Sequence, residues 1–484
     1  MTSHRGPDGR RVPDPRRWRS TGAPAGKPGP WGLVAVAAIL LVAAGALAWL
    51  AHTGGAPEDG GAGPASPPGG SATGTVPGPT AEEPATPPGD DTQAAGGAQG
   101  GEGEPGSPAG RGDGTGPSTG DAGGGRVVLR VEEVAAGLEV PWDMAFDPEG
   151  RMFFTERPGR INLLDGDRVI RLASLPDTLA IGEAGLLGIA LHPGFPDPPY
   201  VYVYQTYQTR GRGAAVNRVL RFRFDPGAVA SGGASGPGAR SPRLVDRTVV
   251  FDGIPASSIH DGGQLEFGPD GKLYVTTGDA RAAAQAQNPR SLHGKILRLN
   301  PDGSVPPDNP LGPDNPVYSY GHRNPEGLAF DPVTGRLFAV EHGPDAGDEI
   351  NRIEPGANYG WPDAVAPASH RGRFTPPLRS YDPIIAPAGA AFYRGPVHAW
   401  DGSLFFGTLG FSPDSAGRHL RRVRLDSSGV RVVEEEELFK GRYGRIRAVQ
   451  IGPDGCVYFG TSNRDGRGEP GPRDDRILRA CPVS

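Results

Sequence analysis

Lysine and cysteine are both scarce in this chain of 484 residues. The four lysines are Lys27, Lys272, Lys295 and Lys440. Nearly all positive charge is therefore arginine, so an anion site would have to use guanidinium groups or backbone amides. The two cysteines do not form a Cys-x-x-Cys motif, which excludes a cysteine-rich zinc site. The formal net charge of −6 argues against nucleic acid as a partner.

The N-terminal part is organised as a membrane anchor followed by a linker. Residues 1–30 are basic, and residues 31–51 form an apolar run without charge that is long enough to span a bilayer. The basic flank predicts a cytoplasmic tail, a single transmembrane helix and an extracytoplasmic remainder. The alternative is a cleaved signal segment, since Ala46–Ala48 resembles a small-x-small cleavage site, and the protein would then be secreted.

Glycine and proline, at 78 and 54 residues, are abundant, and many of them lie before residue 125. Residues 52–125 contain almost no bulky apolar side chains, so they cannot bury enough surface to offset the entropy of ordering. We therefore expect a disordered linker at 52–125 and one folded domain at 126–484.

The folded domain contains an internal repeat. A pattern of alternating apolar residues, a turn rich in Asp, Gly and Pro, and a second alternating segment occurs six times. The copies begin at Met144, Ile189, Leu265, Leu328, Ala391 and Val449. Further short strands lie between them, so six four-stranded units predict an all-β, six-bladed β-propeller. A β-sandwich or two all-β domains would not require six copies.

The two cysteines lie in the last repeat and near the end of the chain. In an oxidising compartment Cys456 and Cys481 could form a disulfide that fixes the C-terminus to the final blade. Two buried free thiols are the alternative.

Four loop clusters hold more polar and glycine residues than turning requires. They are 181–188, 258–263, the group 321–327 with 341–351 and 358–362, and 444–447. Guanidinium groups at Arg323, Arg445 and Arg447 suit an anionic ligand with carboxylates. The loop with Asp345, Asp348 and Glu349 suits a hard cation such as calcium.

His260 stands just before the third repeat, where a loop leads into a strand. Histidine exchanges its proton near neutral pH, so His260 is a candidate general base. A structural histidine is the simpler interpretation when it is considered alone.

Taken together, these motifs resemble one family. His260, Gly-His-Arg-Asn-Pro-Glu-Gly at 321–327, the 341–351 segment and Asn-Tyr-Gly-Trp-Pro at 358–362 are similar to the soluble PQQ-dependent aldose sugar dehydrogenases of the glucose/sorbosone dehydrogenase family. The resemblance covers about residues 130–480, and this family also has a six-bladed propeller.

The resemblance implies a function and a set of site residues. The enzyme would oxidise aldose sugars to lactones at C1, with hydride passing to PQQ and electrons then leaving to an external acceptor. His260 would be the base and Arg323 would polarise the quinone, while Glu183, Asn324, Arg445 and Arg447 would also bind PQQ. One Ca²⁺ ion would be bound by the backbone of Gly343 and Pro344, and another by Glu349 and the carbonyl of Tyr359.

Two positions depart from the family pattern. Some members have glutamine at Glu183, and a carboxylate there would repel an anionic cofactor unless it were protonated or bound to metal. Some have a lysine on the fifth-blade strand, whereas residues 407–412 contain none. Backbone contacts or Arg421 could substitute for it, or cofactor affinity would be reduced.

Two other functions therefore stay open. The missing lysine favours a non-catalytic propeller that binds carbohydrate or protein. A metal-dependent lactonase is a weaker alternative, since the arginines would then be superfluous.

Overall fold

The computed structural model describes residues 127–209, 213–227, 240–370, 372–412 and 415–483. The predicted tail, transmembrane segment and linker at 1–30, 31–51 and 52–125 lie outside these residues. Within the described ranges, no helix is both long enough and apolar enough to cross a bilayer. Contacts divide the chain into two units, 1–105 and 106–484, and every described residue belongs to the second.

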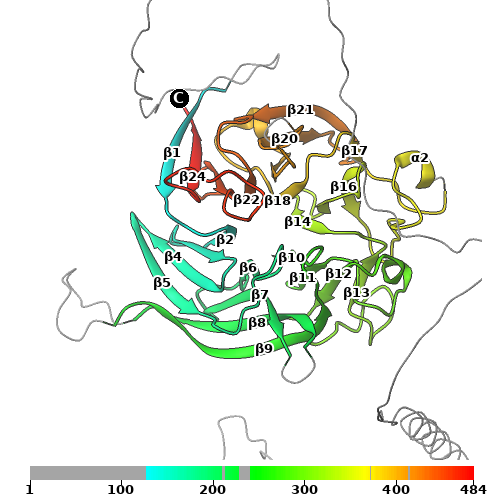
Figure 1. The fold of residues 1–484 in the computed structure, drawn as a ribbon, viewed down its shortest axis with the longest axis horizontal. Helices are drawn as coiled ribbons and strands as arrows, with labels where there is room; N and C mark the ends of the chain where they lie inside the picture. Colours follow the sequence, from blue (N-terminus) through cyan, green and yellow to red (C-terminus); the bar gives the residue numbers. More distant parts are fainter. Residues whose placement is uncertain (1–126, 210–212, 228–239, 371, 413–414, 484) are drawn as a thin grey trace, which may run out of the picture. The chain divides into compact units, whose positions relative to one another are not determined.

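Six four-stranded antiparallel sheets are arranged around a central axis, which confirms the predicted all-β six-bladed propeller (Figure 1). The first blade contains β2 (Pro141–Phe146), β3 (Met152–Glu156), β4 (Arg160–Asp165) and β5 (Arg168–Ser174). The second contains β6 (Leu186–Leu191), β7 (Tyr200–Gln208), β8 (Ala215–Asp225) and β9 (Arg243–Pro255). The third contains β10 (Gly262–Phe267), β11 (Leu273–Thr277), β12 (Lys295–Leu299) and β13 (Val317–Tyr320).

The remaining blades follow the same order from the inner to the outer strand. The fourth contains β14 (Pro325–Phe330), β15 (Leu337–Glu341), β16 (Asp348–Ile353) and β17 (Arg379–Tyr381). The fifth contains β18 (Pro387–Phe392), β19 (Ser403–Thr408), β20 (Leu420–Leu425) and β21 (Val432–Leu438). The sixth contains β22 (Ile446–Ile451), β23 (Val457–Thr461), β24 (Ile477–Pro482) and β1 (Leu129–Ala135). The helical turns described are η1 (Ala283–Gln287), α2 (Pro367–His370) and η2 (His398–Trp400).

The ring is closed by the two ends of the folded domain. Strand β1 pairs antiparallel with β24, so the outermost strand of the sixth blade comes from the beginning of the domain. Cys456 and Cys481 form a disulfide, which confirms the predicted pairing and links β24 to the turn before β23. Through this closure the sixth blade obtains its fourth strand from the other end of the folded domain.

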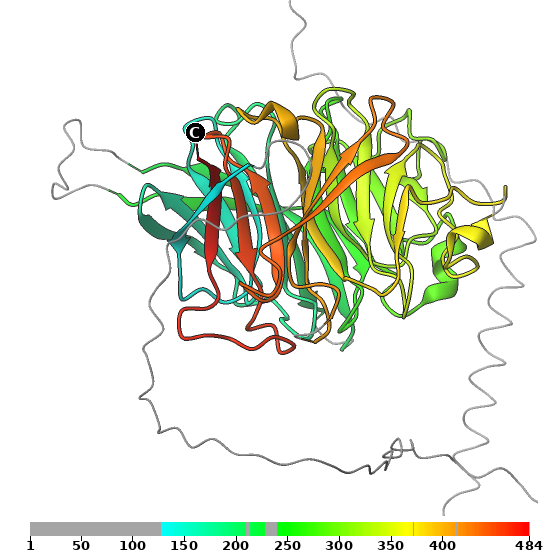
Figure 2. The same ribbon diagram turned by 90° about the horizontal axis from the view of Figure 1, so that it is seen from above.

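The six inner strands β2, β6, β10, β14, β18 and β22 surround the central axis (Figure 1). Seen from the side, the strands of the blades run between the two ends of the channel (Figure 2). Each inner strand pairs with the second strand of its blade, and the register breaks beside its first residues. Such bulges bend a strand and redirect side chains. The loops that precede the inner strands therefore meet at one end of the channel, which is the end where the candidate residues gather.

Asp143 on β2 ties three inner strands together inside the channel. Its Oδ2 accepts hydrogen bonds from the backbone N–H of Ile189 at 3.0 Å and from Gln264 Nε2 at 2.8 Å. Around the channel, apolar side chains from adjacent blades pack between the sheets, and Phe153, Phe405 and Phe459 are fully buried. Each such side chain contributes about 1.5–3 kcal/mol through burial.

Candidate active site

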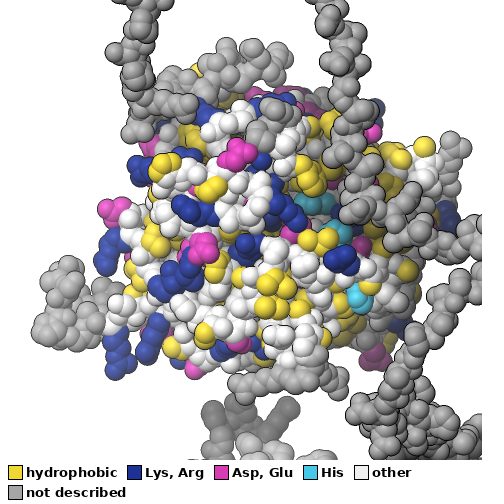
Figure 3. Space-filling model, in the orientation of Figure 1, with side chains coloured by type: hydrophobic (Ala, Val, Ile, Leu, Met, Phe, Trp, Pro, Cys, Tyr) yellow, Lys and Arg dark blue, Asp and Glu magenta, His cyan; other side chains and the backbone are white. Residues whose placement is uncertain are grey.

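A cavity of about 400 Å³ lies at the end of the channel where the inner strands begin. This volume falls within the range of small-molecule sites. Its walls include Glu183, His260, Arg323, Gly343, Pro344 and Arg445, so the structure brings six of the predicted site residues together. Histidine side chains are visible near the centre of the face in Figure 3, beside Lys or Arg side chains.

A larger cavity, of about 620 Å³, lies at the opposite end of the channel. Apolar side chains from the ends of the inner strands line much of it, including Phe146, Phe330 and Phe392. Glu266 also faces it, and burial raises the pKa of Glu266 to about 8. Because the arginines and His260 line the other cavity, we place the candidate site there.

His260 is held by acidic partners on both its backbone and its ring. Its backbone has φ of +63°, a conformation that costs energy for a non-glycine residue. The backbone N–H donates to Glu183 Oε2 at 2.7 Å, and ring Nδ1 lies 2.8 Å from Asp279 Oδ1. A proton on Nδ1 satisfies Asp279 and leaves Nε2 as the free base.

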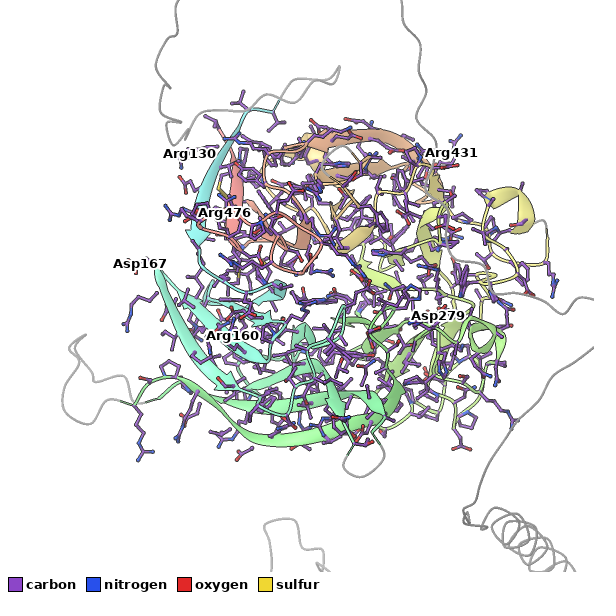
Figure 4. All side chains as sticks on the ribbon, viewed as in Figure 1. Arg130, Arg160, Asp167, Asp279, Arg431 and Arg476 are labelled. Carbon is purple, nitrogen blue, oxygen red and sulfur yellow. A yellow bond between two sulfur atoms is a disulfide. The ribbon has the colours of Figure 1, made fainter. Side chains whose placement is uncertain are left out.

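Asp279, labelled in Figure 4, is a functional residue that sequence reasoning missed. Its Oδ1 also accepts the backbone N–H of Arg281 at 2.8 Å, and its Oδ2 accepts Trp361 Nε1–H at 2.9 Å. Burial alone would raise the pKa of Asp279, but hydrogen bonds from His260 and these donors outweigh it and lower the pKa. Asp279 is therefore an ionised carboxylate that fixes the orientation of the His260 ring.

Glu183 is charged, although it faces the cavity. Burial opposes ionisation, but His342, the backbone N–H of His260 and Arg467 together lower the pKa of Glu183. Glu183 Oε1 forms an ion pair with Arg467 Nη1 at 2.8 Å. The sequence analysis named protonation and metal binding as two ways to relieve the repulsion that Glu183 would cause. In the structure the ion pair with Arg467 offsets the charge of Glu183, and the sequence analysis had not singled out Arg467.

Besides Arg467, two arginines form the positive wall of the cavity. Arg323 lies with its guanidinium 5.3 Å from the ring centre of Trp361, and Nη1 donates to the carbonyl of His342 at 3.3 Å. Among the described residues, the buried Nε of Arg323 has no hydrogen-bond partner. Arg445 is paired with Asp465 at 2.9 Å and also donates to the carbonyls of Leu409 and Gly410.

Asn324 and Arg447 lie behind this wall. Asn324 is fully buried, accepts the backbone N–H of Gly262 at 3.0 Å and donates to Glu326 Oε1 at 3.1 Å. Arg447 is also buried and forms an ion pair with Glu326 Oε2 at 2.6 Å. In this arrangement both residues support the floor of the site.

The predicted metal residues surround a third, much smaller cavity of about 20 Å³, next to the candidate site. Gly343, Pro344, Glu349 and Tyr359 line it together with Glu341. Burial, together with the nearby charge of Glu341, raises the pKa of Glu349 well above its ordinary value. Two carboxylates that face one small buried space favour a cation between them.

The other two acidic residues of this loop have different roles. Asp345 is exposed. Asp348 accepts backbone N–H groups of Gly343, Ile385 and Ala386 at 2.6–2.8 Å, so it holds two loops in place. We therefore assign Asp348 a structural role instead of the predicted place among the oxygen ligands.

Arg421 does not replace the lysine that is missing from the fifth blade. It points toward β21, where Nη1 and Nη2 form ion pairs with Glu435 and Glu437, both at 2.7 Å. Its guanidinium also lies 4.9 Å from the ring centre of Tyr381. Arg421 is therefore buried between the outer strands of the fourth and fifth blades, and it does not line the cavity.

Fold and site together define a six-bladed β-propeller with a His–Asp pair in an arginine-walled cavity at one end of its channel. The family model described as Glucose / Sorbosone dehydrogenase matches residues 138–478. The chain belongs to this family, which confirms the resemblance seen in its motifs.

Individual relatives and solved structures are consistent with this family. Aldose sugar dehydrogenase YliI of Escherichia coli K12 is 31% identical over 363 residues, which cover 70% of this chain and 91% of the relative. The PQQ-bound aldose sugar dehydrogenase of Streptomyces coelicolor is 37% identical, with a TM-score of 0.62 over 73% of this chain and 98% of that one. An oxidoreductase (glucose dehydrogenase) structure from Thermus thermophilus is 45% identical, with a TM-score of 0.63 over 73% and 100% of the two chains.

Proposed function

We propose that this protein is a PQQ- and calcium-dependent aldose dehydrogenase that oxidises sugars at C1 to lactones. The observation that carries the proposal is the His260–Asp279 pair, which opens into a cavity walled by arginine. The relatives named above include a PQQ-bound aldose sugar dehydrogenase, and this supports the same activity here.

The residues of the cavity fit an anionic cofactor. PQQ carries carboxylates, and the buried Nε of Arg323, which lines the cavity, lacks a partner among the residues described. Buried polar groups without partners are rare and point to a missing ligand or water. Arg445 and Arg467 add further positive charge on the same cavity.

In the bound state, PQQ would supply the hydride acceptor and Ca²⁺ a Lewis acid beside it. His260 Nε2 takes the proton of the C1 hydroxyl as the C1–H bond gives up its two electrons and C1 becomes a carbonyl. Asp279 stabilises the imidazolium that forms, because its charge lies 2.8 Å from Nδ1. Arg323 stabilises negative charge that develops at the cavity wall.

Calcium would be held by the loop that follows β15. Gly343 and Pro344 line both cavities, so their carbonyls are suited to an ion beside the cofactor. Glu349 and the Tyr359 carbonyl are suited to a second ion. His370 Nε2 already lies 3.1 Å from that carbonyl oxygen, which has a second lone pair for a cation.

The cellular setting is part of the proposal. A single membrane-spanning segment at 31–51 would keep the propeller outside the cell membrane, and cleavage there would release it. Electrons would pass to an external acceptor. The loops 207–217, 230–243 and 364–380 are short or low in aromatic residues in the sequence, which favours broad specificity among aldoses.

Reconstitution of the full chain with PQQ and Ca²⁺ tests the proposal. We would measure dye reduction over a panel of mono- and disaccharides, for the wild type, for His260→Ala and for a control, His398→Ala. The side chain of His398 is 90% exposed, so its loss should leave the rate unchanged. We expect activity that requires both additions and that falls at least ~100-fold in His260→Ala.

Other outcomes would separate the alternatives. If the wild type binds PQQ tightly but oxidises none of the sugars, PQQ remains the assigned ligand and the proposed oxidation of aldoses is rejected. No PQQ binding by the wild type would favour the non-catalytic propeller. Glu349→Gln tests the calcium site separately: Ca²⁺ should raise the melting temperature of the wild type by more than that of the variant.

A further inference from the structure

The segment 415–419 contains three buried polar atoms without hydrogen-bond partners among the described residues. They are Ser415 Oγ, Arg418 Nε and His419 Nδ1. The segment leads into β20 of the fifth blade, next to the loop that follows β19. Three such atoms in five residues are unusual, since buried polar side-chain atoms are nearly always paired.

Among the residues that the structure describes, Arg418 is a buried cation without a close anion. Its relative exposure is 5%, and its nearest described carboxylate is Glu469 at 3.9 Å, on a side chain that is 71% exposed. Its contact with the carbonyl of Arg467 is long, at 3.5 Å. By contrast, Arg422, on the strand that follows, has a carboxylate at 2.8 Å. A buried charge without a partner is costly, so this position calls for an anion.

Ser415 and Arg418 pack against Gly410, which lines the candidate cavity. Gly410 has φ of +59°, and a Cβ there would collide with Ser415 Oγ and lie 3.1 Å from Arg418 Cγ. The two side chains therefore occupy the space beside Gly410 that a side chain at position 410 would need. The Gly410 carbonyl also accepts from Arg445, so two arginine side chains contact this short stretch of backbone.

We propose that Arg418, assisted by Ser415, is the residue of the fifth blade that contacts the anionic cofactor, and that it binds one of the cofactor's carboxylates. It would supply the positive charge that the segment 407–412 lacks, from a position a few residues further along the chain. This inference rests on the proposed function, because PQQ is the anion in question.

PQQ affinity of the Ca²⁺-loaded full chain tests the inference without any turnover. We would measure the PQQ dissociation constant by fluorescence quenching for the wild type, Arg418→Met, Arg418→Lys, Ser415→Ala and a control, Arg424→Met. Arg424 belongs to the same blade, and its side chain is 42% exposed and paired with Glu434, so the control removes an equal charge from the outer face.

We expect Arg418→Met to weaken PQQ binding by about 10- to 100-fold, the range for a lost charge-assisted hydrogen bond. Arg418→Lys keeps the charge and should recover most of the affinity, and Ser415→Ala should lose a few-fold. Arg424→Met should bind as the wild type does. The melting temperature without PQQ should not fall in Arg418→Met, because the guanidinium it removes has no close carboxylate.

Two results would overturn the inference. If Arg418→Met, or Arg418→Gln should the first not fold, binds PQQ as tightly as the wild type, Arg418 is not a cofactor contact and the proposed function stands. If the wild type itself binds no PQQ, the proposed function fails and this inference fails with it. A lower melting temperature without PQQ, at unchanged affinity, would assign Arg418 a structural role.

Discussion

Replacement of Asp279 by Asn tests how His260 is oriented. The carboxylate accepts from two fixed donors, Arg281 N–H on Oδ1 and Trp361 Nε1–H on Oδ2, as well as from His260. An amide has one oxygen, so either orientation of the new side chain sets an NH₂ group against one of these donors. If the NH₂ group faces His260, the ring must accept at Nδ1, and the proton moves to Nε2, where the base is needed.

The size of the effect follows from the contacts. A buried hydrogen bond to a charged group contributes about 1.5–3 kcal/mol, which is about 10- to 150-fold in rate at about 1.36 kcal/mol per factor of ten. Loss of the free Nε2 would add to this, up to the roughly 10²–10⁴-fold range of general-base catalysis. We therefore expect kcat of Asp279→Asn to fall at least tenfold.

The assay is steady-state dye reduction with PQQ and Ca²⁺ saturating, together with PQQ affinity. Affinity should change by no more than a few-fold, because Asp279 is 1% exposed and lies behind His260. Asp252→Asn, an exposed carboxylate that accepts from Tyr207, is the matched control. A kcat within threefold of the wild type would show that Asp279 does not orient the base.

Three further predictions concern stability. The pKa of Glu266 is raised from an ordinary value near 4.5 to about 8, so the folded state binds this proton more tightly than the unfolded state does. Protonated Glu266 therefore stabilises the fold fully below pH 4.5, and this stabilisation is lost as pH rises through 8. In urea unfolding, Glu266→Gln should flatten the dependence of the free energy of unfolding on pH between pH 5 and 8. The size is on the order of 1–3 kcal/mol, because the side chain opens onto a cavity and is partly screened. Reduction of the Cys456–Cys481 disulfide, which closes a loop with a sequence separation of 25, should cost about 3.5 kcal/mol in the same assay. Lys295→Met should cost about 3–5 kcal/mol, since the fully buried Nζ donates to backbone carbonyls of the 285–294 segment that would lose their partner.

Matched variants separate these effects from general damage. Lys272→Met removes a half-buried lysine whose Nζ bonds only Asn300 among the residues described, and it should cost less than about 1 kcal/mol. Glu266→Gln should retain full activity, since the residue lies at the opposite end of the channel. An unchanged pH slope in Glu266→Gln, or equal losses in the two lysine variants, would contradict the reasoning.

The repeat pattern predicted the propeller because each blade begins with a local signal. Alternating apolar residues around an Asp/Gly/Pro turn can be recognised within a short stretch of sequence. The pairing of β1 with β24 could not be predicted from the sequence, because it joins the two ends of the folded domain and no sequence motif marks it. The disulfide between Cys456 and Cys481 was predicted from the compartment and from the number of cysteines.

The site was only partly predictable, for a geometric reason. Motif residues such as His260 and Arg323 precede inner strands, and the sequence marks those positions. Asp279 and His342 instead follow the second strands β11 and β15, which return to the same end of the channel. Both residues could have been found by looking for polar residues one or two positions after the second strand of a blade. Arg467 and Arg418 come from longer loops, where no period sets the position of a side chain.

The two ends of the channel differ because their connections differ. At the end opposite the site, tight turns join the first and second strands, and their aspartates are used by the turn itself: Asp147, Asp270 and Asp454 each accept backbone N–H groups within four residues. These side chains have little capacity left for a ligand. At the site end, the connections vary in length and leave His260, Arg323 and Arg445 free to face a shared cavity. A fold in which one end is fixed by turn geometry can therefore change its ligand through the other end alone, and substitutions that alter substrate choice should fall in the loops that lead into the inner strands.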